Sequence, residues 1–410
     1  MPTSGLTLVV VGASYAGAQV AAAARQSGFA GKVQLLGDEP ELPYQRPPLS
    51  KTFLTGGAAE ASLPLRSEVY YREQNIELLT GARVTGIDRA ARQVTCADGR
   101  RHAYDWLALA TGARPRPLPL PGAGLEGVLE LRTLADARKL KARLAEAQRV
   151  VVIGGGFIGL EAASAAATLG KQVMVLEAAP RLLARACTQG ISDYVHQLHK
   201  RHGVDLVTGA QVASILGQNG RVRGVALAGG AERAADLVLV GIGVLPNVEL
   251  AQAAGLECND GIVVDRYART SDPRIVAAGD CTRFPSPWAA SPVRLESVQN
   301  ANDQARTAAA TVCGREVPHE SVPWFWSDQY DMRLQMAGLP AGFDAQAVRG
   351  AVDEGKFSIF YLRGGRIVGA DSVSRAGDHM LARKLIAAGA TATVEQLRDP
   401  AFDLKSLLPK

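Results

Sequence analysis

Two segments of the chain repeat one pattern, and this repeat limits the possible folds more than any other feature. Residues 7–17 read TLVVVGASYAG, and residues 149–163 read RVVVIGGGFIGLEAA. In each copy an apolar strand enters a glycine-rich turn, and a helical stretch and a second strand follow. The expected helices span 19–27 and 161–169, and the expected second strands span 33–36 and 172–176. Two such βαβ units, about 140 positions apart, predict an α/β protein with two Rossmann-like dinucleotide-binding domains.

The second glycine motif is complete and predicts an NAD site. Gly154, Gly156 and Gly159 follow the spacing in which the three glycines make the turn, admit a pyrophosphate and let helix pack on strand. The phosphates then lie at the helix N-terminus, where free N–H groups favour an anion. Glu177 lies 18 positions past Gly159 and is the expected acceptor for a ribose hydroxyl.

The carboxylate of Glu177 would also repel a 2′-phosphate, which favours NADH over NADPH. Arg181 and Arg185 follow closely and weaken that preference. They are either surface arginines or contacts for the adenosine half of the nucleotide.

The first glycine motif is degenerate. Ser14 stands where the middle glycine is expected between Gly12 and Gly17, so its Cβ should crowd the pyrophosphate. The strand and helix context is intact, and Asp38 lies 21 positions past Gly17. We expect a second dinucleotide site with Asp38 or Glu39 on a ribose; the alternative is a tight turn without a ligand.

Proline and glycine clusters suggest where the domains join. Residues 115–121 (PRPLPLP) contain four prolines, which exclude a helix or a central strand. Residues 241–247 (GIGVLPN) follow an apolar strand, and a further strand with a glycine turn lies at 275–280. The expected domains are 1–115 with 246–320 for the first dinucleotide, 116–245 for NAD, and 321–410 as a small α+β domain.

Composition excludes several classes of protein. No stretch approaches the roughly 20 apolar residues of a membrane span, and no export signal is recognisable at the N-terminus. The five cysteines form no Cys-x-x-Cys motif, so we expect neither a disulfide framework nor a metal site. The expected location is a reducing cytoplasm. The net charge is +5, and the sequence contains no run of five like charges, which argues against a nucleic-acid-binding protein.

Two dinucleotide sites in one chain favour hydride transfer between nicotinamide and a tightly held flavin. Across nearly its whole length the chain resembles the FAD-dependent ferredoxin reductases, which include reductase components of aromatic-ring dioxygenases. The segments RPPLSK and PWFWSDQ are specific to this subfamily. The similar segments are 37–51, 110–112, 131–134, the GGGFIGLE block, 241–247, 278–284, 296–300 and 323–329.

The resemblance implies roles for individual residues. Ala16 and Asp38 should hold the pyrophosphate and ribose of FAD, Lys51 and Val298 should approach the flavin ring, and Asp280 should bond the ribityl chain. The implied FAD residues are Gly12, Ser14, Ala16, Gly17, Asp38, Arg46, Lys51, Val84, Arg132, Asp280 and Val298. The implied NAD residues are Gly154, Gly156, Phe157, Ile158, Gly159, Glu177, Arg185 and Gly243.

Glu161 is an unusual residue for a nucleotide-binding helix. Two residues past Gly159, it is expected in the first turn, where its carboxylate would repel a pyrophosphate unless it points elsewhere. Our hypothesis is that it pairs with Lys51 beside the flavin N5. A cation there would favour the reduced, anionic flavin and raise its potential.

Trp324 and Trp326 are two of the four tryptophans, and their spacing places both on one face of a strand. They either pack in the core or, as the resemblance implies for Trp326, line the electron exit at the flavin edge. Cys281 is also expected near the ring but has no second cysteine for a disulfide relay.

The resulting hypothesis is an NADH:ferredoxin oxidoreductase. Hydride passes from NADH to FAD, and single electrons then pass to an acidic two-iron two-sulfur ferredoxin that feeds an oxygenase. Arg306, Arg333 and Lys384 are candidates for its docking patch, and a monomer or weak dimer is expected. The alternatives are a redox-sensing NADH-binding flavoprotein and a flavin-dependent disulfide or peroxide reductase, although Ser50 stands where the latter needs a thiol.

Overall fold

A computed structural model describes residues 3–409, and the first glycine motif follows a strand of its first sheet. Its five strands are all parallel, in the order β19-β7-β1-β2-β3. The strands are β1 (Thr7–Val11), β2 (Lys32–Leu36), β3 (Ile76–Leu79), β7 (Trp106–Leu109) and β19 (Ile275–Ala277). Residues of β1 alternate between two apolar clusters, so both faces of the sheet are covered, as parallel sheets require.

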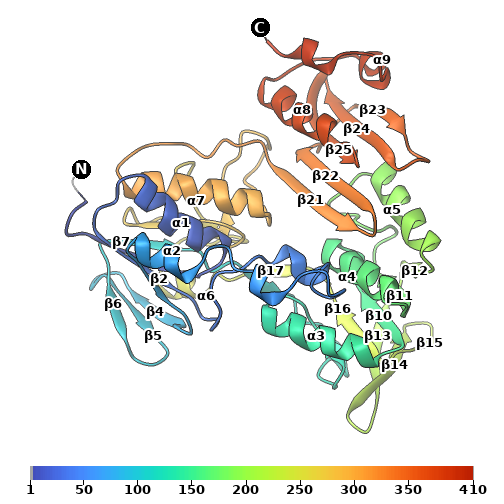
Figure 1. The fold of residues 1–410 in the computed structure, drawn as a ribbon, viewed down its shortest axis with the longest axis horizontal. Coiled ribbons are helices and arrows are strands. Elements are labelled where there is room, and N and C mark those ends of the chain that lie inside the picture. The colour runs from blue at the N-terminus through green and yellow to red at the C-terminus, as the bar shows by residue number, and fades with distance from the viewer. Residues whose placement is uncertain (1–2, 410) are drawn as a thin grey trace.

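Helices α1 (Tyr15–Gln26) and α7 (Val298–Val312) lie side by side over one face of this sheet (Figure 1). The other face lies toward a three-stranded antiparallel sheet and the loops that follow it. The small sheet consists of β4 (Val84–Asp88), β5 (Gln93–Cys96) and β6 (Arg101–Ala103). Strand β19 comes from far along the chain, so the first sheet is built from two separate segments.

The second sheet repeats this plan. Its order is β12-β11-β10-β16-β9, again all parallel. The strands are β9 (Val128–Leu129), β10 (Arg149–Ile153), β11 (Gln172–Glu177), β12 (Asp205–Thr208) and β16 (Leu237–Val240). One face packs on α3 (Leu134–Glu146), α4 (Phe157–Thr168) and α5 (Gln189–Arg201), and the other packs on β13 (Val212–Gln218), β14 (Arg221–Leu227) and β15 (Glu232–Ala234).

The two passages between the parallel sheets lie together. Strand β8 (Ala113–Pro115) pairs antiparallel with β17 (Val244–Pro246), and prolines end both strands. The chain therefore leaves and re-enters the first sheet region along one short ribbon. The domain division at residues 115, 245 and 320 stays a prediction.

The C-terminal region is a five-stranded antiparallel sheet in the order β21-β22-β25-β24-β23. The strands are β21 (Trp324–Gln329), β22 (Met332–Gly338), β23 (Ala345–Ala351), β24 (Lys356–Arg363) and β25 (Arg366–Val373). Helices α8 (Ala376–Ala387) and α9 (Val394–Arg398) cover one face, and the other face packs toward α5, as Figure 1 shows. The predicted fold class is confirmed. The remaining short elements are η1 (Pro47–Ser50), η2 (Glu60–Ser62), α2 (Glu68–Glu73), α6 (Glu249–Ala253), β18 (Ile262–Val263), β20 (Thr282–Arg283) and η3 (Leu404–Leu407).

Both nucleotide helices begin four residues earlier than the sequence suggested. They start at Tyr15 and Phe157, with Ser14 and Gly156 as their N-caps. The third glycine of each motif lies inside the first turn because the helix packs directly on the preceding loop. Glu161 therefore belongs to the second turn of α4, and the expectation that it lies in the first turn was wrong.

In the described part of the chain, every helix is too short or too polar to cross a membrane.

Candidate functional site

The two glycine loops have matching geometry at the carboxyl ends of β1 and β10. Gly12 and Gly154 have φ angles of +104° and +110°, which side chains rarely adopt. A Cβ on Gly12 would lie 2.1 Å from the carbonyl oxygen of Ala110, and one on Gly154 would lie 2.4 Å from that of Gly241. Each loop thus runs against the neighbouring strand and delivers the chain to a helix whose first N–H groups lack intrahelical acceptors. Both loops fit a pyrophosphate.

The middle position differs between the copies. Around Gly156, an added Cβ would meet no protein atom within 4 Å, so a bound group can approach the main chain there. At the matching position the Ser14 hydroxyl accepts a hydrogen bond from Nε of Arg46, 3.3 Å away. That contact brings a guanidinium to the N-terminus of α1. The expected crowding of a pyrophosphate by Ser14 stays a prediction.

The acidic residue after the second strand also differs. Glu177 ends β11, and its carboxylate accepts hydrogen bonds from the N–H groups of Gly155 (2.5 Å) and Ala179 (2.7 Å). Strand pairing aligns Leu36 with Val11 and Leu176 with Ile153, so the counterpart of Glu177 in the first copy is Gly37.

Asp38 therefore lies one residue beyond the position that Glu177 occupies, and its side chain is exposed. The alternative residue, Glu39, is engaged by Nη2 of Arg46 and by the Tyr44 hydroxyl, each 2.5 Å away. Within the described residues Asp38 makes no ion pair, so it is the freer of the two predicted ribose acceptors.

Two arginines from separate segments lie beside the first glycine loop. Arg46 donates to the carbonyl oxygen of Arg132 at 2.6 Å, and Arg132 forms an ion pair with Asp280 at 2.9 Å. Ser14, Arg46, Arg132 and Asp280 are thus brought together, and the sequence assigned all four to FAD. Half-buried guanidinium groups beside a helix N-terminus fit an anionic dinucleotide.

Three other predicted FAD residues lie on separate elements. Ala16 is buried at the start of α1, where an added Cβ on Gly279 would lie 2.9 Å from it. Val298 is the first residue of α7. Val84 begins β4 and packs against the apolar cluster on the other face of the first sheet, without a contact to the arginines.

Lys51 and Glu161 meet in a buried ion pair. Nζ of Lys51 lies 2.8 Å from Oε2 of Glu161, and their side chains are 14% and 5% exposed. Lys51 directly follows η1, whose two prolines fix the local chain, and Glu161 projects from α4. The expected pairing of these residues is therefore present. The pair joins the segment that follows Arg46 to the helix of the second glycine motif.

Two hydroxyl groups complete the surroundings of Glu161. Ser50 donates to Oε2 at 2.5 Å, and Ser327, from β21, donates to Oε1 at 2.7 Å. A buried carboxylate is expensive unless such donors stabilise it. Glu161 is therefore the point where η1, α4 and the C-terminal sheet are tied together.

The predicted NAD residues lie along the second loop. The guanidinium of Arg185 lies over Gly243, with Nη2 3.0 Å from the position of an added Cβ. Arg181 instead donates to the carbonyl oxygens of Ala184 and Cys187, so it stabilises its own loop. Phe157 packs on Phe325 with ring centroids 4.7 Å apart, and Ile158 is 39% exposed.

The tryptophan pair lies between two helices. The rings of Trp324 and Trp326 are 5.6 Å apart, which agrees with the prediction that both occupy one face of β21. The N–H of Trp324 donates to Oε1 of Gln299 on α7, and its ring contacts His379 and the Arg383 guanidinium of α8. Both tryptophans are half-buried.

Sequence reasoning missed Ser327 and Gln329 as site residues. Both follow the tryptophans in β21, and both are buried. The same period of two that placed Trp324 and Trp326 together places these polar residues on the opposite face. The available signal was a serine and a glutamine at alternate positions of a strand that begins Trp-Phe-Trp.

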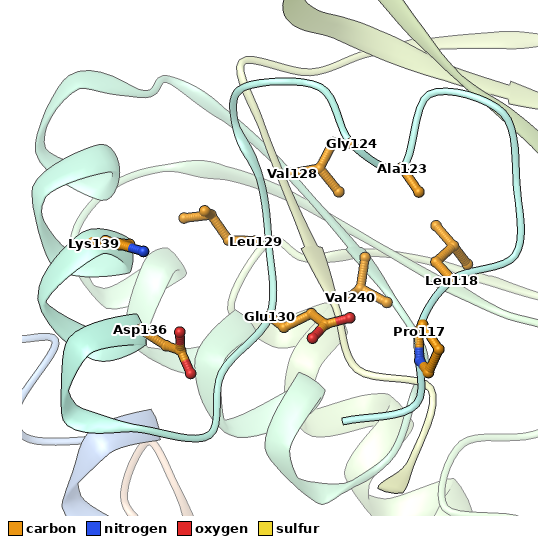
Figure 2. A pocket seen from close by; sticks show the side chains of 10 residues that line it. All are labelled: Pro117, Leu118, Ala123, Gly124, Val128, Leu129, Glu130, Asp136, Lys139 and Val240. Carbon is orange, nitrogen blue, oxygen red and sulfur yellow. The ribbon is translucent and has the colours of Figure 1, made fainter. Parts of the chain in front are cut away.

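A cavity of about 430 Å³ lies beside the second sheet (Figure 2). Apolar side chains such as Leu129 and Val240 line it together with Glu130, whose pKa burial raises. Asp136, also in the lining, lies in α3 and accepts a hydrogen bond from the main-chain N–H of Thr133, the N-cap of that helix. None of the predicted site residues lines this cavity.

Comparison with known proteins identified relatives along the whole chain. A model described as pyridine nucleotide-disulphide oxidoreductase matches residues 6–305, and one described as reductase C-terminal matches residues 324–408. Rhodocoxin reductase of Rhodococcus erythropolis is 48% identical over 400 residues, which cover 98% of this chain and 94% of that protein.

Two solved structures are similar over nearly their full length. One is a ferredoxin reductase from Rhodopseudomonas palustris, with a TM-score of 0.95, 46% identity, and coverage of 98% of this chain and 99% of that one. The other is the covalent complex of putidaredoxin reductase with putidaredoxin, with a TM-score of 0.95, 42% identity and coverage of 98% of each chain.

Proposed function

The chain belongs to the pyridine nucleotide-disulphide oxidoreductase family, whose members bind FAD and NAD(H), and we propose that it is an NADH:ferredoxin reductase. One observation carries the proposal. Lys51, five residues past the Arg46 that contacts Ser14, meets Glu161 on the helix of the second glycine motif, and a C-terminal strand contacts the same carboxylate. This geometry suits a site where two nucleotides meet.

Bound FAD supplies the chemistry, because it can accept a hydride from a nicotinamide and release single electrons. The chain's own residues hold the charges around it. Lys51 places a positive group at the junction, and Glu161 fixes the position of Nζ. Arg46 and Arg132 provide positive groups for the pyrophosphate, while Glu39 and Asp280 hold those arginines in place.

The positions of the thiols argue against a disulfide or peroxide reductase. Among the described residues no cysteine forms a hydrogen bond with Lys51 or Glu161, and the hydroxyl of Ser50 lies next to the carboxylate. Burial raises the pKa of Cys281 and of Cys187, which disfavours the thiolate form that such chemistry needs. Five unpaired cysteines also fit the reducing cytoplasm that we propose as its location.

The preference for NADH rests on Glu177. Its carboxylate closes the second glycine loop through the N–H of Gly155, so it stays at the end of β11. A 2′-phosphate in that place would face the negative carboxylate. Arg181 does not offset this repulsion, because its guanidinium is bound to main-chain carbonyls.

The partner that we propose is an acidic two-iron two-sulfur ferredoxin, and the docking face lies around the tryptophan pair. The helices on either side of Trp324 carry Arg306 (α7) and Lys384 (α8), both exposed. Arg306 forms an ion pair with Asp303, and Arg333 forms one with Asp328. Lys384 has no ion pair among the described residues and should contribute most. We propose a monomer or weak dimer.

A panel of electron acceptors tests the proposal. The purified holoenzyme should reduce a two-iron two-sulfur ferredoxin rapidly with NADH, and should reduce glutathione disulfide and hydrogen peroxide only at background rates. Rapid disulfide or peroxide turnover would contradict the proposal. So would slow NADH oxidation together with no electron transfer to any ferredoxin, which is the pattern of a redox sensor.

Substitution of Lys51 tests its role at the junction. Lys51→Met keeps the length of the side chain and removes the charge, so the bound flavin should become harder to reduce. We expect hydride transfer from NADH, measured by anaerobic stopped flow, to slow at least tenfold, and the flavin potential to fall. An unchanged potential and rate would contradict the role.

A further inference from the structure

Behind Glu161 a row of buried polar side chains continues away from Lys51. Oγ of Ser327 lies 2.7 Å from Oε1 of Glu161, and Nε2 of Gln329 lies 3.1 Å from Oγ of Ser327. The Oε1 atom of Gln329 lies 2.7 Å from Nε2 of His199, whose Nδ1 lies 3.3 Å from the Tyr330 hydroxyl. Ser327 and His199 are fully buried, and Gln329 is 1% exposed.

The charge of Glu161 fixes the direction of every bond in this row. An ionised carboxylate only accepts, so the single hydroxyl proton of Ser327 points to it. Oγ of Ser327 must then accept from the amide nitrogen of Gln329, which turns the amide oxygen toward His199. The histidine therefore carries its proton on Nε2 and accepts on Nδ1 from Tyr330.

The surroundings of His199 agree with one neutral tautomer. Burial lowers its pKa to about 4, and the neighbouring His202 ring stacks on Tyr330. His199 belongs to α5, whereas Ser327 and Gln329 belong to β21. The row thus ties the second nucleotide region to the C-terminal sheet through the one carboxylate that holds Lys51.

We propose that Ser327, oriented by Gln329 and His199, is a positioning residue that holds the Glu161 carboxylate against Lys51 and so sets the field at the flavin. This inference rests on the role proposed above for Lys51. The hydroxyl dipole offsets part of the negative charge of Glu161 and fixes one of its oxygens. Without it Oε1 of Glu161 loses its donor, while Lys51 and Ser50 still hold Oε2, and the junction becomes more negative.

The test substitutes Ser327→Ala in the holoenzyme and measures the midpoint potential of bound FAD together with NADH binding. The flavin should become about tenfold harder to reduce, which for a two-electron couple is a fall of about 30 mV. Hydride transfer should slow several-fold while the dissociation constant for NADH stays within a factor of two. Ser327→Thr, which restores the hydroxyl, should recover the potential.

Ser358→Ala is the matched control. Ser358 is also fully buried in the C-terminal sheet and also donates to a carboxylate, Asp378, but it does not contact the junction. The midpoint potential of FAD in this variant should equal that of the wild type. If Ser327→Ala matches this control in potential and rate, the proposal is overturned. Should Ser327→Ala not fold, Gln329→Met must lower the potential in the same direction, and no change there overturns it as well.

The outcomes separate this inference from the proposed function. A fall in potential with Lys51→Met but none with Ser327→Ala rejects only the positioning role. If neither variant lowers the potential, the role of Lys51 and the positioning role of Ser327 are both rejected. Electron delivery to ferredoxin is measured separately, so its absence would reject the proposed function without moving the potentials.

Discussion

At the scale of single residues, Asp371 is a buried carboxyl group outside the nucleotide sites. It is 4% exposed, and the hydroxyl of Tyr361 donates to it at 2.7 Å. The same hydroxyl lies 2.6 Å from Oγ1 of Thr188, the N-cap of α5, so the group links the C-terminal sheet to α5. Burial raises the pKa of Asp371 to about 7.

This pKa predicts how stability depends on pH. Between pH 4 and pH 7 the folded protein holds a proton on Asp371 that the unfolded chain has released, so the free energy of unfolding falls as pH rises. Above about pH 7 both states are ionised, and the slope disappears. A pKa of about 7 in place of 3.8 corresponds to roughly 4 kcal/mol.

Asp371→Asn checks this contribution, because asparagine is uncharged and similar in shape. Urea unfolding at pH 5 and pH 8 should show a smaller loss of stability in the variant than in the wild type. Other groups titrate equally in both proteins, so the difference isolates Asp371. Equal losses in the two proteins would contradict the assignment.

At the scale of elements, the second glycine loop contains one glycine that the fold requires and one that leaves room for a ligand. Gly154 is required by the fold, because a side chain there would meet the carbonyl oxygen of Gly241 in a strained conformation. Gly156, two residues later, has open space above it. The two positions should therefore respond differently to the same added methyl group.

We expect Gly156→Ala to keep the wild-type melting temperature and FAD content while the dissociation constant for NADH rises at least fivefold. Gly154→Ala should lower the melting temperature as well, by several degrees, because its loop must shift. Scanning calorimetry and NADH titration measure both effects. If Gly156→Ala binds NADH like the wild type, the nucleotide does not approach that loop.

The elements show which features a sequence can predict. Apolar strands such as β1, β10 and β16 were located to within about a residue, because a parallel strand covered on both faces is a continuous apolar run. The helix starts were wrong, because the glycine motif belongs partly to the helix. Gly37, and not Asp38, is the counterpart of Glu177, and this depends on strand register, which spacing alone does not determine.

At the scale of the whole molecule, three regions meet at Glu161, and this explains which site residues were predictable. Lys51 and Glu161 belong to local motifs, so their pairing could be proposed from the sequence. Ser327 and His199 lie 166 and 38 positions from Glu161, and no local pattern joins them. Ser327 contacts Glu161, and Gln329 contacts His199, because the C-terminal sheet packs on α4 and α5.

The distribution of charge predicts how the partner docks. Lys384 is an exposed lysine on α8, beside the tryptophan pair, and Lys139 is an exposed lysine on α3. Figure 1 shows the two helices far apart, with α8 near the top of the view and α3 near the bottom. Lys384→Glu and Lys139→Glu therefore change the net charge equally at different places.

Lys384→Glu should lower kcat/KM for an acidic ferredoxin about tenfold at low salt, and the effect should shrink above 0.3 M salt, where charges are screened. Reduction of ferricyanide by NADH, which needs no docking, should stay unchanged. Lys139→Glu should match the wild type in both assays. Equal losses in the two variants would show that only overall charge matters.

The central claim is that electrons pass from NADH through bound FAD to a ferredoxin, and double-mixing anaerobic stopped flow tests it most directly. The yellow holoenzyme is mixed with NADH or NADPH and then with an oxidised two-iron two-sulfur ferredoxin. We predict rapid bleaching by NADH, bleaching at least tenfold slower by NADPH, and prompt return of the flavin colour as ferredoxin is reduced. Failure of NADH to bleach the flavin, or a reduced flavin that ferredoxin does not reoxidise, would contradict the account.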